Sequence, residues 1–399
     1  MDPRTNPYAP GAGTPPPELA GRDALIERID VALDRIKNGR AARSFVMYGL
    51  RGVGKTVLLN KVRQDALANG VYAVNIEAPE SRSLPASLAP ALRATLLRLS
   101  ASAAAKEYAG KALRALGGFI NGLKLKFNDI ELGVELPLEK GLADSGNLDH
   151  DLTELMISVG QAAQEQGTAV VLFIDEIQHV PEEQLASLIM ALHAASQAQL
   201  PITMVGAGLP QLLGQMGDAK SYAERLFEFV HVDKLDHDNA VAAIVVPAQR
   251  EHVDYEPGAL HEILERTSGY PYFLQEWGKH AWDIAVQSPI TEADARAATA
   301  QALAELDASF FRVRLDRLSG AEKQYMRAMA ELGPGPHRSG DIATCMKRKV
   351  TSVAPTRSSL IRKGMVYAPN HGDTAFTVPL FDEYMRRVMP VFAPAPAGD

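Results

Sequence analysis

Apolar residues follow two different periods along the chain, and these periods predict its elements. Short, mainly apolar segments that predict strands occupy residues 44–48, 71–77, 169–174, 202–205 and 228–232, and the continuous apolar run at 169–174 is typical of a strand buried on both faces. Between these runs, apolar residues recur three and four positions apart, which predicts helices over 19–36, 57–68, 84–116, 148–166, 182–198 and 211–213. Strands that alternate with helices predict an α/β fold, with a mainly parallel sheet covered on both faces.

Beyond residue 235 the strand pattern stops. Helical periodicity there predicts a small helical domain from 239–250, 259–267, 272–286 and 292–311. Helices over 321–332, 340–347 and 353–363 then precede a hairpin that turns at 370–373, an order that indicates a winged helix. The predicted domains are a proline-rich extended arm (1–17), an α/β core (18–235), the helical domain (236–315), the winged helix (316–389) and a flexible tail (390–399).

A change of period interrupts the predicted core between about residues 100 and 147. Apolar and polar residues alternate over 123–127 and again over 130–136, on either side of Asn128-Asp129, which predicts a two-stranded hairpin over 123–136. One interpretation is a flap that seals an edge of the core. The other is a contact surface for a protein partner or for DNA.

Composition excludes several classes of protein. The chain has 399 residues, 46% of them hydrophobic, and a formal charge of −7, which argues against indiscriminate coating of nucleic acid. A single cysteine, Cys345, excludes an internal disulfide, and the ten histidines include no His-x-x-x-His pair, so no transition-metal site is predicted. No apolar run reaches the roughly 20 residues of a membrane helix. We therefore expect a cytoplasmic protein with no membrane contact.

A glycine-rich loop, Gly49-Leu50-Arg51-Gly52-Val53-Gly54-Lys55-Thr56, joins the first predicted strand to a helix. The spacing is that of a phosphate-binding loop, in which glycines let backbone N–H groups turn toward phosphate oxygens. Lys55 would supply charge for the outer phosphates, and the Thr56 hydroxyl would be a Mg²⁺ ligand. The nucleotide-binding residues predicted here are Gly49, Gly52, Val53, Gly54, Lys55, Thr56 and Val57.

The strand over 169–174 ends in two carboxylates, Asp175 and Glu176. Beside a phosphate-binding loop, one carboxylate can hold Mg²⁺ through water while the other polarises the attacking water. We assign the first role to Asp175 and the second to Glu176. The predicted site is thus equipped to hydrolyse a nucleoside triphosphate.

Together, the phosphate loop, the Ile-Asp-Glu sequence, the helical domain and the winged helix resemble an AAA+ ATPase. The resemblance is to the archaeal replication-initiator ATPases and the related STAND-like ATPases. Asn6-Pro7-Tyr8 with Pro17, Leu19, Gly21, Arg22 and Asp23 is similar to the N-terminal segment of that clade, which packs on adenine. The resemblance implies that the chain binds ATP or ADP together with Mg²⁺ and forms a homo-oligomer. It also implies that Leu19 and Arg22 lie near the nucleotide, and that Pro271 begins a helix that packs on the base.

The resemblance also implies an arginine that reaches a neighbouring subunit's ATP from the end of the helix before the fifth strand. Arg225 has that position and is the predicted third catalytic residue, with Lys55 and Glu176. The alternative is an ordinary surface ion pair. Two departures indicate slow or assembly-dependent hydrolysis: residues 206–208 offer no polar sensor, and Gly269-Tyr270-Pro271 stands where the initiators have Gly-Asp and an arginine.

The predicted winged helix has a basic segment, with Asp341 as the only acid between residues 340 and 364. Such a local excess of cations predicts contact with duplex DNA. The predicted DNA-binding residues are Lys347, Arg348, Lys349, Thr356, Arg357, Arg362 and Lys363. Winged helices also bind proteins. The sequence therefore leaves open an ATP-driven switch on DNA, a signalling or defence regulator that binds a protein, and an ATP-binding scaffold without turnover.

Overall fold

The computed structural model describes residues 1–11, 13–78, 82–124, 126–127, 136–137 and 139–392. At its centre is a five-stranded parallel sheet of order β2-β3-β4-β1-β5, which confirms the predicted α/β class. The strands are β1 (Ser44–Tyr48), β2 (Tyr72–Glu77), β3 (Val170–Asp175), β4 (Ile202–Gly208) and β5 (Phe227–His231). β4 lies between β1 and β3, so the loop after β1 and the carboxylates after β3 are at the same edge of the sheet.

Helices cover both faces of the sheet, because its strands are apolar on both sides. Alternate residues of β1 point to opposite faces: Phe45 and Met47 pack with α1 (Asp23–Lys37) and α2 (Lys55–Ala68), and Val46 faces the other side. The other side is covered by α3 (Leu84–Ser100), α4 (Lys106–Leu123), α5 (Leu148–Glu165) and α6 (Glu182–Gln197). Shorter elements are η2 (Ile177–His179), α7 (Leu212–Ala219) and α8 (Ala223–Leu226).

Two predictions about residues 84–136 differ from the structure. The mostly helical stretch expected over 84–116 consists of two helices, because α3 and α4 pack against each other and this packing overrides the helix propensity of the alanines between residues 101 and 105. The hairpin is wrong at its beginning, since α4 continues to Leu123 and the amide of Phe127 bonds back to the Leu123 carbonyl in a helical turn. Residues 128–135 of the hairpin lie outside the described residues.

The helical domain consists of α9 (His237–Arg250), α10 (Pro257–Thr267), α11 (Pro271–Ile284) and α12 (Glu292–Leu306), and we call it the lid. A π-helical turn, η3 (Asp307–Phe311), leads into α13 (Arg312–Asp316). The arm begins with η1 (Pro3–Thr5) and packs on the lid, where the Tyr8 hydroxyl donates to the Ile244 carbonyl at 2.5 Å. Gly278 permits this contact, because a Cβ there would lie 2.7 Å from the Tyr8 ring.

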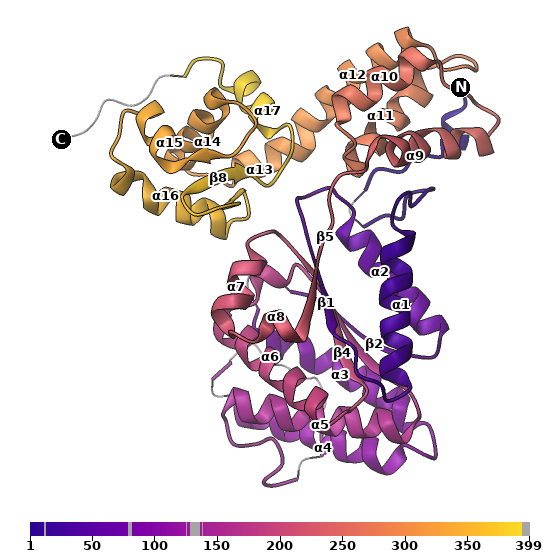
Figure 1. Cartoon of the computed structure of the whole chain (residues 1–399), viewed down its shortest axis with the longest axis vertical. Helices are drawn as coiled ribbons and strands as arrows, with labels where there is room; N and C mark the ends of the chain where they lie inside the picture. Colours follow the sequence, from indigo (N-terminus) through magenta and orange to yellow (C-terminus); the bar gives the residue numbers. More distant parts are fainter. Residues whose placement is uncertain (12, 79–81, 125, 128–135, 138, 393–399) are drawn as a thin grey trace.

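The remaining elements form what we call the C-terminal domain (Figure 1). They are α14 (Gly320–Leu332), β6 (His337–Arg338), α15 (Ser339–Cys345), α16 (Val350–Arg362), β7 (Val366–Tyr367), β8 (Asp373–Phe376) and α17 (Phe381–Val388). The sheet order is β6-β8-β7, and both pairs are antiparallel. The sequence did not predict α17, which buries Phe381 and Met385.

The lid and the C-terminal domain share one apolar core. Trp277 of the lid, Phe311 of the connecting π-helical turn and Tyr325 of α14 belong to the same buried cluster. Figure 1 shows both parts beyond the carboxyl end of the central sheet, with β5 leading into α9. A movement of the lid would therefore also displace the C-terminal domain. None of the described helices is long and apolar enough to cross a membrane.

Candidate nucleotide-binding site

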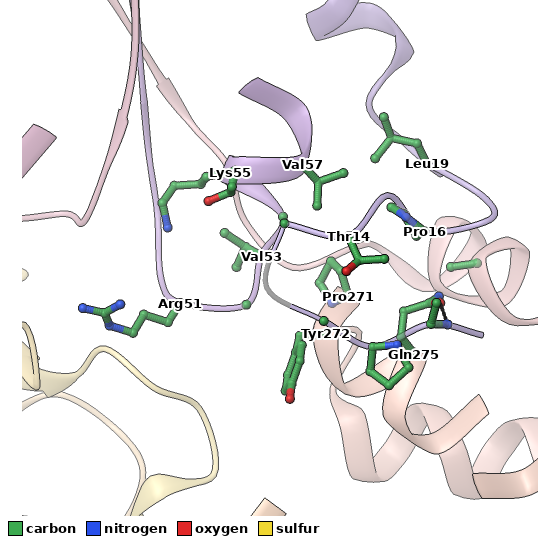
Figure 2. A pocket seen from close by; sticks show the side chains of 18 of the residues that line it. Thr14, Pro16, Leu19, Arg51, Val53, Lys55, Val57, Pro271, Tyr272 and Gln275 are labelled. Atoms are coloured by element: carbon green, nitrogen blue, oxygen red, sulfur yellow. Dashed lines mark hydrogen bonds between the residues drawn. The ribbon is translucent and has the colours of Figure 1, made fainter. Parts of the chain in front are cut away.

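A cavity of about 460 Å³ lies where the loop after β1, the arm and the lid meet. Figure 2 shows that it has two different ends: Lys55 and Arg51 lie at one, and Thr14 and Pro16 of the arm, with Leu19 just after it, face Pro271 and Gln275 of the lid at the other. The predicted residues that line it are Leu19, Arg22, Gly52, Val53, Gly54, Lys55, Thr56, Val57, Asp175, Glu176 and Pro271. The fold thus brings together residues from four separated parts of the chain.

The glycines of the loop have two different functions. Gly52 and Gly54 have φ values of 82° and 91°, in the left-handed region that favours glycine, and both line the cavity. Gly49 has another role, because a Cβ there would lie only 2.1 Å from the Val232 carbonyl oxygen at the end of β5. Close packing of the ends of β1 and β5 therefore requires Gly49. We expected Gly49 to lie around the phosphates, and in this respect the structure differs from the prediction.

Lys55 is the first residue of α2, and it is only 9% exposed. Its Nζ donates hydrogen bonds to the carbonyl oxygens of Gly49 and Leu50, at 2.9 and 2.8 Å. Burial lowers the pKa of Lys55 to about 8; Glu176 and Asp175 oppose this shift, and Arg51 adds to it. The site therefore contains an ammonium group whose charge is costly without a nearby anion.

Asp175 and Thr56 lie together at the edge of the sheet. The Asp175 carboxylate accepts a hydrogen bond from the Glu176 amide at 2.8 Å and another from the Thr56 hydroxyl. Burial raises the pKa of Asp175, and the hydrogen bond from Thr56 partly counteracts that rise. These two oxygen-bearing groups, one on each side of β4, form a donor set suited to a hard cation.

Glu176 has a left-handed backbone, with φ of 50°, and this conformation turns the chain sharply after β3. Its carboxylate accepts a hydrogen bond from the Gln178 side chain, and it lies 3.7 Å from Nη1 of Arg51 and 3.9 Å from Nε2 of His179. The other end of the Gln178 amide accepts from the Leu209 amide, just past β4, at 3.0 Å.

Gln178 is a residue that sequence reasoning missed. It connects the end of β4 to Glu176, although β4 itself has no polar side chain there. Gly208 makes room for it, since a Cβ at that position would lie 2.7 Å from the Gln178 side-chain oxygen. Thr203, the polar residue of β4, instead bonds to Ser44 at the opposite end of the strands, 2.9 Å away. No local signal pointed to Gln178.

Arg314 was also missed. It lies on α13, between the lid and the C-terminal domain, and lines the cavity together with Tyr272 and Phe310. Its guanidinium stacks on the Phe310 ring, 3.8 Å from the centroid, and Phe310 stacks in turn on Tyr272. Burial lowers the pKa of Arg314 to about 10, and nearby Arg51 lowers it further. The only local signal was the spacing of Phe310 and Arg314, which places them on one helix face.

Arg22 and Tyr272 hold the loop in place from opposite sides. Nη2 of Arg22 donates to the carbonyl of Val53 at 3.3 Å and to that of Asp233 at 2.5 Å, and burial lowers the pKa of this arginine. The amide of Tyr272 donates to the carbonyl of Gly52 at 3.1 Å. The conformation of the loop therefore depends on both the arm–core junction and the lid.

The C-terminal domain also contacts the loop. The amide of Arg51 donates to the Thr377 carbonyl at 3.0 Å, and the Gln211 side chain donates to the Ile361 carbonyl at 3.4 Å. A second cavity of about 480 Å³ lies along this contact; it is lined by His179 and by the charged residues Arg51, Glu77, Glu176, Arg314, Arg317 and Lys363. His179 thus lies beside Glu176.

Arg225 is far from this cavity. It lies on α8, immediately before β5, and β5 begins where β1 begins, at the edge of the sheet opposite the loop. Its side chain is exposed, and it forms no ion pair with the described residues of the chain. Within one subunit it therefore cannot reach the cavity.

The predicted DNA-binding residues fall into two groups. Lys347, Arg348 and Lys349 are exposed between α15 and α16, and Arg362 is exposed at the end of α16. The remaining basic residues have partners inside the domain. Arg357 donates to the Thr374 hydroxyl and the Asp373 carbonyl, each at 2.7 Å, and Lys363 is paired with Glu322 at 2.8 Å.

Thr356, the other predicted DNA contact, is half-buried on α16. The Lys363 ammonium, with hydrogen bonds from Ser319 and Ser359, lowers the pKa of Glu322 to about 2 despite burial. Arg357 and Lys363 therefore both connect α16 to neighbouring elements; Arg357 is half-buried, whereas Lys363 remains exposed.

Comparison with known proteins assigns the class. Residues 18–205 match the family described as AAA ATPase domain, and residues 308–385 match a domain of unknown function (DUF8462). Residues 18–205 are therefore an AAA ATPase domain, in agreement with the resemblance to AAA+ ATPases in the sequence. No curated protein sequence matches the chain.

Solved structures share this fold. The chain is similar to the Walker-type ATPase PABY2304 of Pyrococcus abyssi, with a TM-score of 0.58, 16% identity, and coverage of 94% of this chain and 97% of that chain. Weaker similarity extends to the ORC1 protein of Aeropyrum pernix in complex with DNA (TM-score 0.48, 14% identity, 93% of each chain). It also extends to the RuvB Holliday junction branch migration motor of Thermotoga maritima (TM-score 0.44, 15% identity, 94% of this chain and 96% of that chain).

Proposed function

We propose that the 460 Å³ cavity binds ATP, with the base between the arm and the lid and the phosphates at the loop. The apolar end, where Leu19 and Pro16 face Pro271, fits a planar base (Figure 2). The other end presents Lys55 beside two left-handed glycines, whose N–H groups suit phosphate oxygens. The lowered pKa of Lys55 supports this placement, because an anion bound there would offset the cost of burying its charge.

The residues around Asp175 fit Mg²⁺. The Thr56 hydroxyl and the Asp175 carboxylate are hydrogen-bonded to each other at the edge of the sheet, and hard divalent cations bind such oxygen ligands. We assign the ion to these two residues. When bound, Mg²⁺ would neutralise part of the charge on the outer phosphates.

For hydrolysis, Glu176 would accept a proton from the attacking water, and Gln178 would hold the carboxylate in position. Lys55 and Arg314 are two of the cations that line the same cavity, and they could stabilise charge on the transferred phosphoryl group. Arg225, which cannot reach its own cavity, would complete a neighbouring subunit's site. The active form would then be a homo-oligomer.

The proposed output is an ATP-dependent switch on DNA. The observation that carries it is the hydrogen bond from Arg51, within the phosphate loop, to Thr377 of the C-terminal domain. A change at the loop on ATP binding or hydrolysis would reach this domain directly, and the domain exposes Lys347, Arg348 and Lys349 together. Interpreted as a winged helix, the domain would bind duplex DNA through that basic surface.

The test is to measure particle mass with ATP, with ADP and with added duplex DNA at low and high salt. We expect assembly with ATP and DNA binding that weakens steeply as salt rises, because phosphate contacts release counterions. Replacing Lys347, Arg348 and Lys349 with alanine should abolish DNA binding, whereas Arg357→Ala serves as a control for a basic residue that is bonded internally. Failure to bind duplex DNA at low salt in every nucleotide state would refute this function.

One observation favours a second candidate, a signalling regulator whose C-terminal domain binds protein. Arg357 and Lys363, two of the cations expected on the DNA-binding face, are held by contacts within the domain. In that case the triple alanine variant would keep its activity, and a change in the 123–136 segment would abolish partner binding. The opposite result would leave the DNA switch as the remaining candidate.

A further inference from the structure

Three side chains of the lid converge at a place that the ATPase site does not include. Glu276 and His280 are four residues apart on α11, so they share one helix face, and Glu305 approaches from α12. One ligand-capable atom from each lies within 4.8 Å of those of the other two. Sequence reasoning looked for paired histidines and did not consider a Glu-x-x-x-His pair completed by a second helix.

Two of these atoms are buried without a hydrogen-bond partner among the described residues. They are Oε2 of Glu276 and Nε2 of His280, in residues only 5% and 7% exposed. Nε2 of His280 lies 3.0 Å from Oε2 of Glu305, but the two form no hydrogen bond. Buried polar atoms are nearly always satisfied, so this arrangement calls for a ligand.

We propose that Glu276, His280 and Glu305 bind a divalent transition metal ion, with Zn²⁺ as the species best suited. One imidazole nitrogen and two carboxylate oxygens are common Zn²⁺ ligands, and the half-exposed Glu305 leaves room for water as a fourth. The second oxygen of Glu276 already accepts a hydrogen bond from the Tyr272 hydroxyl at 2.8 Å. Such an outer partner orients a ligating carboxylate.

This position would connect the metal ion to the ATPase site. Tyr272 lines the nucleotide cavity, its ring stacks on Phe310, and its amide bonds to the carbonyl of Gly52 in the phosphate loop. A metal ion bound to Glu276 would fix α11 against α12 and hold the Tyr272 hydroxyl in place. The inference that the site exists does not rest on the proposed function, because binding of the ion requires only lid residues.

Lys279 is the competing cation. Its Nζ lies 3.2 Å from both carboxylate oxygens of Glu305. If Glu305 serves only this ion pair, the cluster is a polar network without a metal ion. If Glu305 binds a metal ion, Lys279 weakens that binding, because its charge repels the ion and its ammonium occupies the Glu305 carboxylate. Lys279→Ala should then bind the metal ion more tightly.

The experiment is calorimetric titration of the nucleotide-free full chain with Zn²⁺, together with thermal melting. We expect one equivalent of Zn²⁺ to bind and to raise the melting temperature. Glu276→Gln and His280→Asn should each weaken Zn²⁺ binding at least about tenfold. Tyr272→Phe should weaken it by about tenfold, because it removes the hydroxyl that orients the Glu276 carboxylate. The matched control is His261→Asn, because His261 and Glu265 form an exposed pair at the same spacing on α10.

Each outcome either supports or overturns the proposed metal site. Unit stoichiometry in the wild type, with loss in Glu276→Gln, retention in His261→Asn and a gain in Lys279→Ala, would establish the site. Absence of stoichiometric Zn²⁺ binding by the wild type, or equal binding by wild type and both ligand variants, would overturn it. If the ligand variants do not fold, Tyr272→Phe and Lys279→Ala decide the question, since a cluster without metal binding predicts no change in Zn²⁺ affinity for either.

Discussion

The backbone amide of Arg51 donates a hydrogen bond to the carbonyl of Thr377, 3.0 Å away. The side chain of the same arginine lies 3.7 Å from Glu176. A single residue of the phosphate loop therefore contacts both the carboxylate proposed to activate water and the C-terminal domain. We therefore expect the position of the C-terminal domain to depend on whether nucleotide is bound at the phosphate loop.

A substitution at Gly364 should disturb the contact between the phosphate loop and the C-terminal domain. It has a φ of 63°, and a Cβ there would lie 2.9 Å from Leu209 and 3.0 Å from Nη2 of Arg51. Gly364→Leu should separate the C-terminal domain from the loop and release Arg51 from Glu176. Since a partly exposed ion pair contributes up to about 1 kcal/mol, we expect phosphate release to change by about two- to fivefold.

The control for this change is Gly372→Leu. Gly372 has a φ of 82° and lies in the same domain, but its Cβ would meet nothing within 4 Å. Both variants incur similar backbone strain, so only the contact with the loop distinguishes them. Equal rates of phosphate release in the two variants would show that the contact does not affect the site.

Lys55 should make ATP affinity depend on pH. Its pKa of about 8 lies below the usual value, so the ammonium is charged at pH 7 and loses its proton as pH rises through 8. ATP affinity should therefore fall between pH 7.5 and 9, as measured by calorimetry. Lys55→Ala should remove this dependence and weaken ATP binding by about 10- to 100-fold, as expected for a hydrogen bond to a charged group.

Lys61→Ala is the matched control, because Lys61 lies on the same helix but pairs with Asp65 on the surface. It should retain the affinity and the pH profile of the wild type. Lys55→Ala should also lose ATP-dependent assembly. A Lys55→Ala protein that still assembled normally with ATP would contradict the proposed role of the loop.

Glu176→Gln should stop turnover without preventing binding. The amide keeps the size of the side chain but cannot accept a proton from water, and loss of a general base typically costs about 10²- to 10⁴-fold in rate. ATP affinity, measured separately, should stay close to that of the wild type. Phosphate release at the wild-type rate would remove Glu176 from catalysis, and a wild-type protein without turnover would indicate a scaffold.

Arg314→Met should weaken ATP binding more than ADP binding. The guanidinium faces the cavity without an ion pair among the described residues, and its pKa of about 10 reflects burial and repulsion by Arg51. Removing the guanidinium should relieve the free-energy cost of its burial and of its repulsion by Arg51, so the nucleotide-free protein should be at least as stable in thermal melting. ATP affinity should fall about tenfold.

Arg312→Met provides the comparison, since Arg312 is exposed on the same short helix and pairs with Asp316, at 3.8 Å. It should change neither affinity nor stability. A loss of stability in Arg314→Met with unchanged ATP affinity would mean that Arg314 only packs on Phe310.

The sequence by itself determined the α/β fold and the ATPase domain, and it predicted residues that the structure brings to one cavity. Lys55, Thr56, Asp175 and Glu176 could be identified because each follows a strand whose apolar run is readable locally, and parallel strands place their carboxyl ends at one edge of a sheet. The helices of the lid and, apart from α17, those of the C-terminal domain were predictable for the same reason, since the periodicity of a helix is a local property.

Only the tertiary structure decided how the site is completed. Arg51 meets Thr377, and Gln178 joins Leu209 to Glu176, through contacts between distant segments that leave no periodic signal in the chain. The break between α3 and α4 likewise arose from packing that overrides local propensity. Burial, which shifts the pKa values of Lys55 and Asp175, also depends on what covers a side chain, and neighbours in sequence do not specify this.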